Sequence, residues 1–227
     1  MAIDLAAIVG FSRTLRETGS MGTGALIELD RQLARRSVAA SAETGAGAST
    51  LVFSHHAQHH TSFTLRNDGL ASVESSPLLC PGVACFVEGP TQKTLPQFAF
   101  DRKLQAALID GPHAYPFPDL EYFYLYPHLD AGALLALDDI HIPTIHHLFD
   151  FLRREAMFRL SEVRGKTAFF ERTDAPVFDP WGDRWWEQAA NRRTLARYTW
   201  MQTAQRAIPE RLRAWLRTHA DRARLRK

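Results

Sequence analysis

Apolar residues recur at helical spacing in the first part of the chain. Leucine, isoleucine and valine positions within residues 2–18, and again within residues 24–36, fall on one face of a 3.6-residue period. The glycine-rich run GSMGTG separates the two segments and interrupts helical structure. We therefore expect two helices before the first strand.

Short apolar segments follow, and several of them are apolar on both faces. Strands in a parallel sheet have this pattern because helices cover both sides of the sheet. We expect strands at residues 37–43, 61–65, 83–88, 104–110 and 132–139. The segments 50–58 and 119–129 can form crossovers between strands. Strand, helix and strand in series predict an α/β fold.

The later part of the chain adds a helix and a hairpin. Residues 141–156 carry Pro143 near their start and apolar positions on one face, which predicts a helix. The segments FRLSEV and KTAFFER are joined by a tight turn at Arg164-Gly165, which predicts a β-hairpin and one antiparallel strand. Residues 174–227 begin as a loop rich in Pro, Asp and Trp and then become helical in pattern.

Composition places the chain among ordinary globular proteins. Its 227 residues are 45% hydrophobic and 23% charged, which is enough for one large domain with its own core. The N-terminus lacks the basic leader and cleavage site of a signal peptide, and no apolar stretch is long enough for a membrane span. We expect a cytoplasmic protein with no membrane partner.

Positive charge gathers at the C-terminal end. Residues 191–227 hold eleven of the 27 Lys and Arg residues and two of the 25 acidic ones. Such a segment serves an oligomer contact, an anionic partner or simply a solvated helix face. No nucleic-acid recognition motif accompanies it, so we expect a homo-oligomer formed through the terminal helices rather than a nucleic acid complex.

The segment ETGAGAST, from Glu43 to Thr50, follows the first strand directly. Gly45 and Gly47 allow a sharp turn and a close approach to a ligand, since a Cβ at either position would intrude. Glu43 ends the strand, where its carboxylate repels phosphate but suits a cationic ligand that carries an amine. S-adenosylmethionine, with its sulfonium and ammonium groups, is such a ligand.

Acidic residues also end the fourth and fifth strands. Asp110 lies in IDGPHAY, and Asp138 and Asp139 end GALLALDD. The carboxyl ends of parallel strands meet at one edge of a sheet, where ligands bind, so these carboxylates converge if the two strands are neighbours. Close carboxylates repel one another unless a cation, a proton or an amine lies among them. Helix capping for the aspartate pair and a turn role for Asp110 are the structural alternatives.

Histidines are dense at His55, His56, His59 and His60. They do not match a zinc-binding pattern, and we interpret them as solvated or helix-capping residues.

Together these motifs resemble the class I S-adenosylmethionine-dependent methyltransferases. The E-x-G-x-G loop resembles the first motif of that family, and IDG-x-H-x-Y, a helix, a DD pair, a helix and a hairpin resemble its second half, over about residues 37–173. The resemblance implies a Rossmann-like three-layer sandwich with a seven-stranded, mostly parallel sheet. It also implies a core domain at residues 37–173, an N-terminal helical cap at 1–36 and a C-terminal helical extension at 174–227, all in one compact domain.

Some relatives in this family are magnesium-dependent O-methyltransferases of small molecules. By that resemblance Asp110, Asp138 and Asp139 would hold Mg²⁺ or another divalent cation, which lowers the pKa of a bound hydroxyl and orients it. Those relatives carry an acidic residue, proposed as a base, where this chain has Pro112. His113 is then the best remaining general base, because its ordinary pKa lies near neutral pH.

We therefore predict methyl transfer from S-adenosylmethionine to a hydroxyl of a small-molecule or sugar-containing acceptor. The catalytic residues would be His113, Asp110 and Asp138. The cofactor would be held by Glu43, Thr44, Gly45, Ala46, Gly47, Ser49, Asp68 and Asp110, with Asp68, or Asn67 beside it, in the place of the acid that usually follows the second strand. The alternatives are a metal-independent enzyme for N- or C-methylation, other alkyl transfer or cyclisation, and a non-catalytic protein that binds a partner through its basic tail.

Overall fold

A computed structural model describes residues 3–15 and 21–207. The chain divides into two compact units, residues 1–182 and residues 183–227. The first unit contains α1 (Leu5–Thr14), α2 (Thr23–Leu33), β1 (Val38–Thr44), α3 (Ala48–His56), β2 (Ala57–Thr64), α4 (Asp68–Glu74), β3 (Ala84–Glu88), α5 (Thr91–Thr94), β4 (Leu104–Ile109), α6 (Phe117–Leu125), β5 (Leu129–Leu137), α7 (Pro143–Leu152), β6 (Phe158–Arg164) and β7 (Thr167–Arg172). Short 3₁₀ helices, η2 (Leu95–Gln97) and η3 (Tyr126–His128), follow α5 and α6.

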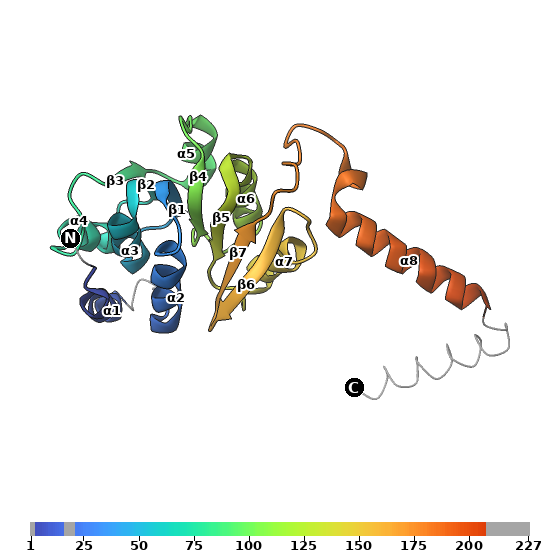
Figure 1. Cartoon of the computed structure of the whole chain (residues 1–227), viewed down its shortest axis with the longest axis horizontal. Helices are drawn as coiled ribbons and strands as arrows, with labels where there is room; N and C mark the ends of the chain where they lie inside the picture. Colours follow the sequence, from blue (N-terminus) through green and yellow to red (C-terminus); the bar gives the residue numbers. More distant parts are fainter. Residues whose placement is uncertain (1–2, 16–20, 208–227) are drawn as a thin grey trace. The chain divides into compact units, whose positions relative to one another are not determined.

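The seven strands form one sheet in the order β3-β2-β1-β4-β5-β7-β6 (Figure 1). The pairs β1–β2, β1–β4, β2–β3 and β4–β5 are parallel, whereas β7 is antiparallel to β5 and to β6. The predicted fold class, a mostly parallel seven-stranded sheet with one antiparallel strand from the hairpin, is therefore confirmed. Strand order reverses between β1 and β4, and ligands bind beside such a switch point in open α/β sheets.

Helices cover both faces of the sheet and form two hydrophobic cores. Side chains alternate along a strand, so Ala106 and Leu108 of β4 pack in the core that includes α2 and α3. Ala107 and Ile109 pack in the opposite core, with α6 and α7. This arrangement explains why the central strands are apolar on both faces, and it gives the three layers expected from the sequence.

The two predicted N-terminal helices correspond to α1 and α2, and the predicted helix at 141–156 corresponds to α7. Strand β2 begins at Ala57, earlier than the expected start at residue 61. The first residues of this strand, AQHH, are mostly polar and therefore do not show the apolar pattern of a buried strand. His60 is 1% exposed rather than solvated, because its two ring nitrogens lie 2.8 Å from the Ser41 hydroxyl and 3.1 Å from a Glu43 carboxylate oxygen. The interpretation of His60 as a solvated or capping residue is wrong for this reason.

The C-terminal boundary also differs from the expected one. Residues 174–182 belong to the first unit, where the Tyr126 hydroxyl donates to the Phe178 carbonyl at 2.9 Å and the Phe178 amide donates to the Met157 sulfur at 3.4 Å. The second unit therefore begins at Asp183, whereas we expected the extension to begin at residue 174 within one compact domain.

Within its described residues the second unit contains η4 (Trp185–Glu187) and α8 (Ala189–Ala207). Much of the basic tail, residues 208–227, lies outside the described residues. In the part of the chain that the structure describes, no helix is long and apolar enough to cross a membrane.

Candidate active site

A cleft of about 480 Å³ opens at the carboxyl ends of the central strands. Small-molecule and cofactor sites have volumes of roughly 300 to 1,000 Å³. The cleft is lined by residues 45–49, 63–65, 67, 89–92, 110–113 and 138–139, together with Met21, Phe117 and Lys166. The glycine loop after β1 and the acidic residues after β4 and β5 therefore share one cleft, as the sequence analysis required.

The loop after β1 is held between two neighbouring strands. The Gly45 amide donates to the Phe63 carbonyl at 2.9 Å, and the Ser62 hydroxyl donates to the Gly45 carbonyl at 2.6 Å. Gly45 has φ +94°, and a Cβ at this position would lie 2.7 Å from the Asp110 carbonyl oxygen. Only glycine fits here without displacing the backbone. The result is a bare stretch of backbone, Gly45 to Gly47, facing the cleft.

Glu43 lies beneath this loop and does not line the cleft. Its carboxylate is fully buried and accepts hydrogen bonds from the hydroxyls of Ser49, at 2.7 Å, and Thr50. His60 contacts the same carboxylate at 3.1 Å, with its ring stacked on Phe53. Direct contact between Glu43 and a cationic ligand, as the sequence suggested, does not fit this burial. Glu43 instead orders the loop and the start of α3 from below.

Thr44 also points away from the cleft and links three elements. Its hydroxyl accepts a hydrogen bond from the Asp110 amide at 3.0 Å and donates to the Glu121 carboxylate at 2.7 Å. Glu121 is 1% exposed, and burial raises the pKa of Glu121 to about 7, an effect that the bond from Thr44 partly offsets. A Cβ on Gly111 would lie 2.0 Å from a Glu121 carboxylate oxygen. Thr44 and Glu121 thus position the Asp110-Gly111 turn.

The polar residue that follows β2 in the cleft is Asn67 rather than Asp68. Asp68 is exposed at the start of α4 and is absent from the cleft lining. Asn67 lines the cleft, and its side-chain oxygen caps α4 by accepting from the Leu70 amide at 2.9 Å. Of the two residues considered from the sequence, the structure favours Asn67 as the one that meets a ligand.

Charged side chains gather where the turns after β4 and β5 meet. His113 Nε2 lies 3.2 Å from one carboxylate oxygen of Asp139 and 3.7 Å from Asp110. Lys166 Nζ lies 2.6 Å from the other oxygen of Asp139 and 3.9 Å from Asp138. Asp139 has φ +55°, a conformation that few non-glycine residues adopt and that marks many functional sites. We call these five residues the acidic cluster.

The cluster shifts the pKa of several members. Burial raises the pKa of Asp110, and the nearby carboxylates of Asp138 and Asp139 act in the same direction against the opposing effect of His113. The Asp110 carboxylate, 3.7 Å away, raises the pKa of His113 against the effect of burial. Burial also raises the pKa of Asp138, although the Thr167 hydroxyl that donates to it opposes the shift. Perturbed groups of this kind, converging in a cleft, are typical of a catalytic site.

The structure changes the candidate metal ligands. Among the described residues, the group of His, Cys, Asp and Glu side chains placed to share one metal ion is Asp110, His113 and Asp139, whose ligand atoms lie within 4.8 Å of one another. Asp138, which we predicted as a ligand, is 1% exposed and is engaged by Thr167. Magnesium prefers oxygen ligands, so two carboxylates and an imidazole with an ammonium at 2.6 Å from one of them do not fit Mg²⁺.

Sequence reasoning missed Lys166 and Glu121. Lys166 lies directly after the predicted Arg164-Gly165 turn, so the hairpin itself was the signal that this side chain reaches the sheet edge. Glu121 lies in the aromatic segment DLEYFYLY, two residues after Asp119, and its neighbours on both sides are apolar or aromatic, which indicates a buried acid. Neither position belongs to a motif that we had recognised.

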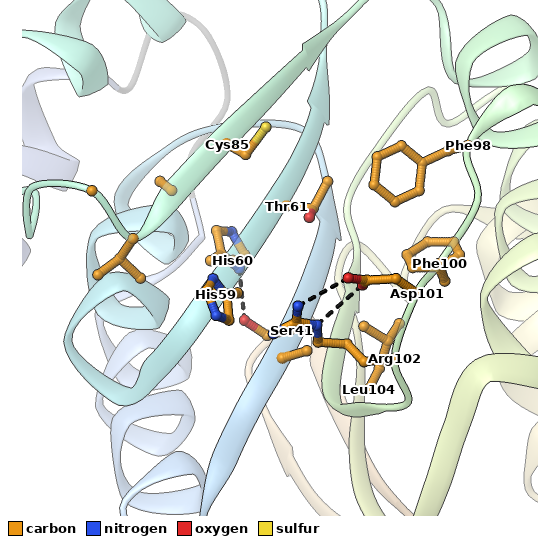
Figure 2. Close-up of a pocket in the computed structure, with 14 residues that line it drawn as sticks. Ser41, His59, His60, Thr61, Cys85, Phe98, Phe100, Asp101, Arg102 and Leu104 are labelled. Carbon is orange, nitrogen blue, oxygen red and sulfur yellow. Dashed lines mark hydrogen bonds and ion pairs between the residues drawn. The ribbon is translucent and has the colours of Figure 1, made fainter.

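A second, smaller hollow lies away from the acidic cluster. Figure 2 shows it between the first halves of β1 to β3 and the segment before β4, with Phe98, Phe100 and the ion pair Asp101–Arg102 at its side. Its volume is about 260 Å³. None of the residues predicted for catalysis or cofactor binding lines it.

Comparisons with known proteins identify a family and structures of similar fold. A family described as a methyltransferase domain matches residues 9–140. The O-methyltransferase TomG from Streptomyces achromogenes, involved in tomaymycin synthesis and solved in complex with S-adenosylmethionine, has a TM-score of 0.61 at 12% identity, over 76% of this chain and 91% of that one. A putative caffeoyl-CoA O-methyltransferase from Staphylococcus aureus has a TM-score of 0.63 at 11% identity, over 75% of this chain and 93% of that one.

An O-methyltransferase from Bacillus cereus, solved in complex with S-adenosylhomocysteine, has a TM-score of 0.58 at 11% identity, over 74% of this chain and 90% of that one. At these identities the three structures show a shared fold. No curated protein sequence matches the chain.

Proposed function

The chain belongs to the methyltransferase domain family, as a class I S-adenosylmethionine-dependent enzyme, and from this premise we propose that it methylates a hydroxyl oxygen of a small-molecule acceptor. The observation that carries the proposal is the convergence of His113 with Asp110 and Asp139 in the same cleft as the glycine loop. An oxygen nucleophile needs a base nearby to take its proton, and His113 is the side chain best placed to do so.

The cleft has the features that S-adenosylmethionine requires. This cofactor supplies a methyl group bound to a positively charged sulfur. The backbone from Gly45 to Gly47 would lie against it, because the methyl group of Ala46 is the only side chain in this stretch. Asn67, which lines the cleft after β2, offers its side-chain amide to the cofactor. The Asp110 carboxylate offers negative charge to a cationic ligand.

His113 is held by carboxylates but remains open to the cleft. Its side chain is 42% exposed, with Nε2 at 3.2 Å from Asp139. A histidine that takes a proton becomes positively charged, and the two neighbouring carboxylates stabilise that charge. Asp138 borders the cleft but is 1% exposed and accepts the Thr167 hydroxyl, so in this proposal it supports the turn that carries Asp139 instead of the catalytic role that we predicted for it.

The acceptor class follows from the cleft lining and from the base. Apolar residues such as Phe63, Leu65 and Phe117 share the lining with Asn67 and Gln92, which suits a molecule with both apolar and hydroxyl-bearing parts. Sugar-containing and phenolic metabolites have this character. Because the residues of the acidic cluster do not fit Mg²⁺, the proposed transfer includes none of the Mg²⁺ assistance that we predicted.

Calorimetry and a transfer assay test the proposal in order. Wild-type protein should bind S-adenosylhomocysteine, and no binding at millimolar ligand would contradict the assignment of the cleft. A panel of phenols and sugar-containing acceptors with methyl-labelled cofactor then identifies the product.

For any acceptor found, His113→Ala should lower the rate by about 10² to 10⁴ while cofactor affinity stays unchanged. His59→Ala, in the second hollow, is the matched control and should keep the full rate. Labelling on nitrogen or carbon instead of oxygen would overturn the choice of acceptor atom.

A further inference from the structure

We propose that the Lys166 ammonium is the built-in cation of the acidic cluster and that this methyltransferase therefore uses no divalent metal there. The inference rests on the proposed function of the same cleft and goes beyond it by naming what balances the carboxylates. In the structure a lysine side chain, delivered by the hairpin, lies where the family resemblance led us to expect a metal ion.

The backbone holds Lys166 firmly at this place. Gly165, with φ +61°, closes the tight turn between β6 and β7. The Ile140 amide donates to the Lys166 carbonyl at 2.9 Å, which ties the turn to the segment that carries Asp138 and Asp139. The adjacent Thr167 hydroxyl donates to Asp138. The backbone of Lys166 and the side chain of the next residue are thus both hydrogen-bonded to the segment of residues 138–140, which carries the charges that Lys166 balances.

The ammonium also takes up the oxygen that a metal would need. Lys166 Nζ lies 2.6 Å from Asp139 Oδ1, and His113 Nε2 lies 3.2 Å from Asp139 Oδ2. Both oxygens of Asp139 therefore lie within ion-pair distance of a nitrogen group, and Oδ1, which accepts no hydrogen bond of good geometry, has the Lys166 ammonium as its nearest charged neighbour. Divalent magnesium would have to approach one of them to about 2.1 Å, which brings two cations together on one oxygen and is opposed by their repulsion.

A lysine in this position can also serve the reaction. Its side chain is 35% exposed, so the ammonium reaches the cleft that His113 shares. In the transfer the acceptor oxygen gives its proton to His113 and forms a bond to the methyl carbon. The carbon–sulfur bond breaks, and its electron pair returns to sulfur. Negative charge that develops on the acceptor oxygen before bond formation is stabilised by the nearby ammonium.

Metal titration of lysine variants tests the inference without a known acceptor. Calorimetry with MnCl₂ and with MgCl₂ is performed on full-length wild-type protein, Lys166→Met, Lys166→Gln and Lys166→Arg. We expect wild type and Lys166→Arg to show no binding at millimolar metal. The Met and Gln variants should gain binding by on the order of tenfold or more, because the competing charge is gone. Lys103→Met removes a lysine bonded to the Pro127 carbonyl outside the cleft and should gain nothing.

Two results would overturn the inference. One is wild-type protein that binds Mn²⁺ or Mg²⁺ at millimolar metal. The other is folded Met and Gln variants that gain no metal binding. Two neutral variants are used so that the test still stands if one of them does not fold. Circular dichroism shows whether each variant is folded. Binding of S-adenosylhomocysteine to the same samples tests the proposed function separately. Wild-type protein that does not bind it would contradict the proposed function, whatever the metal titrations show.

Discussion

Replacing Glu121 by glutamine should stabilise this protein above neutral pH. Glu121 lies on α6 with 1% of its surface exposed, and its Oε1 accepts no hydrogen bond of good geometry, although the nearby Thr91 side chain lowers the pKa of the carboxyl slightly, as Thr44 does. Its other oxygen accepts the Thr44 hydroxyl at 2.7 Å. Burial raises the pKa of Glu121 to about 7. A charge on this carboxylate therefore costs free energy in the folded state, and glutamine has the same shape without that cost.

The sign and size of the effect follow from proton linkage. Between pH 4.5, the ordinary pKa, and about 7 the folded protein keeps a proton that the unfolded chain has released. The free energy of unfolding therefore falls as the pH rises through this window. At about 1.4 kcal/mol per pH unit, the penalty is on the order of 3 kcal/mol at pH 8 and below about 1 kcal/mol at pH 5.

The free energy of unfolding is measured for wild type and for Glu121→Gln at pH 5 and pH 8. Unfolding in urea is followed by circular dichroism. The stability difference, variant minus wild type, should rise by about 2 to 3 kcal/mol between the two pH values. Glu88→Gln is the control, because its bond from Arg66 lowers the pKa of Glu88 and the charged form is the favoured one. Its difference should stay nearly constant between pH 5 and pH 8, because a lowered pKa changes the free energy of unfolding only below about pH 4.5. A Glu121→Gln difference that is equal at both pH values would refute the reasoning.

Three further outcomes test the site and the assembly. Gly45→Ala should abolish S-adenosylhomocysteine binding in calorimetry and cost about 1 to 3 kcal/mol of stability, whereas Gly47→Ala, where a Cβ meets nothing within 4 Å, should fold normally. Thr167→Val should lower the free energy of unfolding in urea by about 1 to 3 kcal/mol, because the buried Asp138 loses its hydroxyl donor. An unchanged free energy of unfolding would show that water replaces the hydroxyl. Deletion of residues 183–227, a unit with exposed aromatic side chains, should convert the expected homo-oligomer to monomer in light scattering, and an unchanged mass would place the contact elsewhere.

Much of the fold was readable because buried parallel strands leave a local signal. The segments 104–110 and 132–139 are apolar on both faces, and they became β4 and β5, paired as neighbours. The hairpin was equally plain from its turn at Arg164-Gly165. The signal failed at β2, whose first residues are polar, because His60 is buried by partners that lie far from it in the sequence.

The site was predictable where backbone direction alone determines position. Asp110 and Asp139 end neighbouring parallel strands, so they had to meet at one edge of the sheet. The direction of each side chain was not determined in this way. Glu43 is the last residue but one of β1, and its side chain points into the core, because the hydroxyls of Ser49 and Thr50 offer it hydrogen bonds there.

The sequence by itself determined the order of the elements, the layered α/β architecture and the edge of the sheet at which chemistry can occur, since these depend on periodicity and chain direction. Only the tertiary structure decided which charges face one another. Lys166, in the turn of the β6–β7 hairpin, reaches Asp139 in the segment after β5, and Glu121 reaches Thr44 from a helix on one face of the sheet. Contacts of this kind depend on distances between segments remote in sequence, and no local pattern of residues records them.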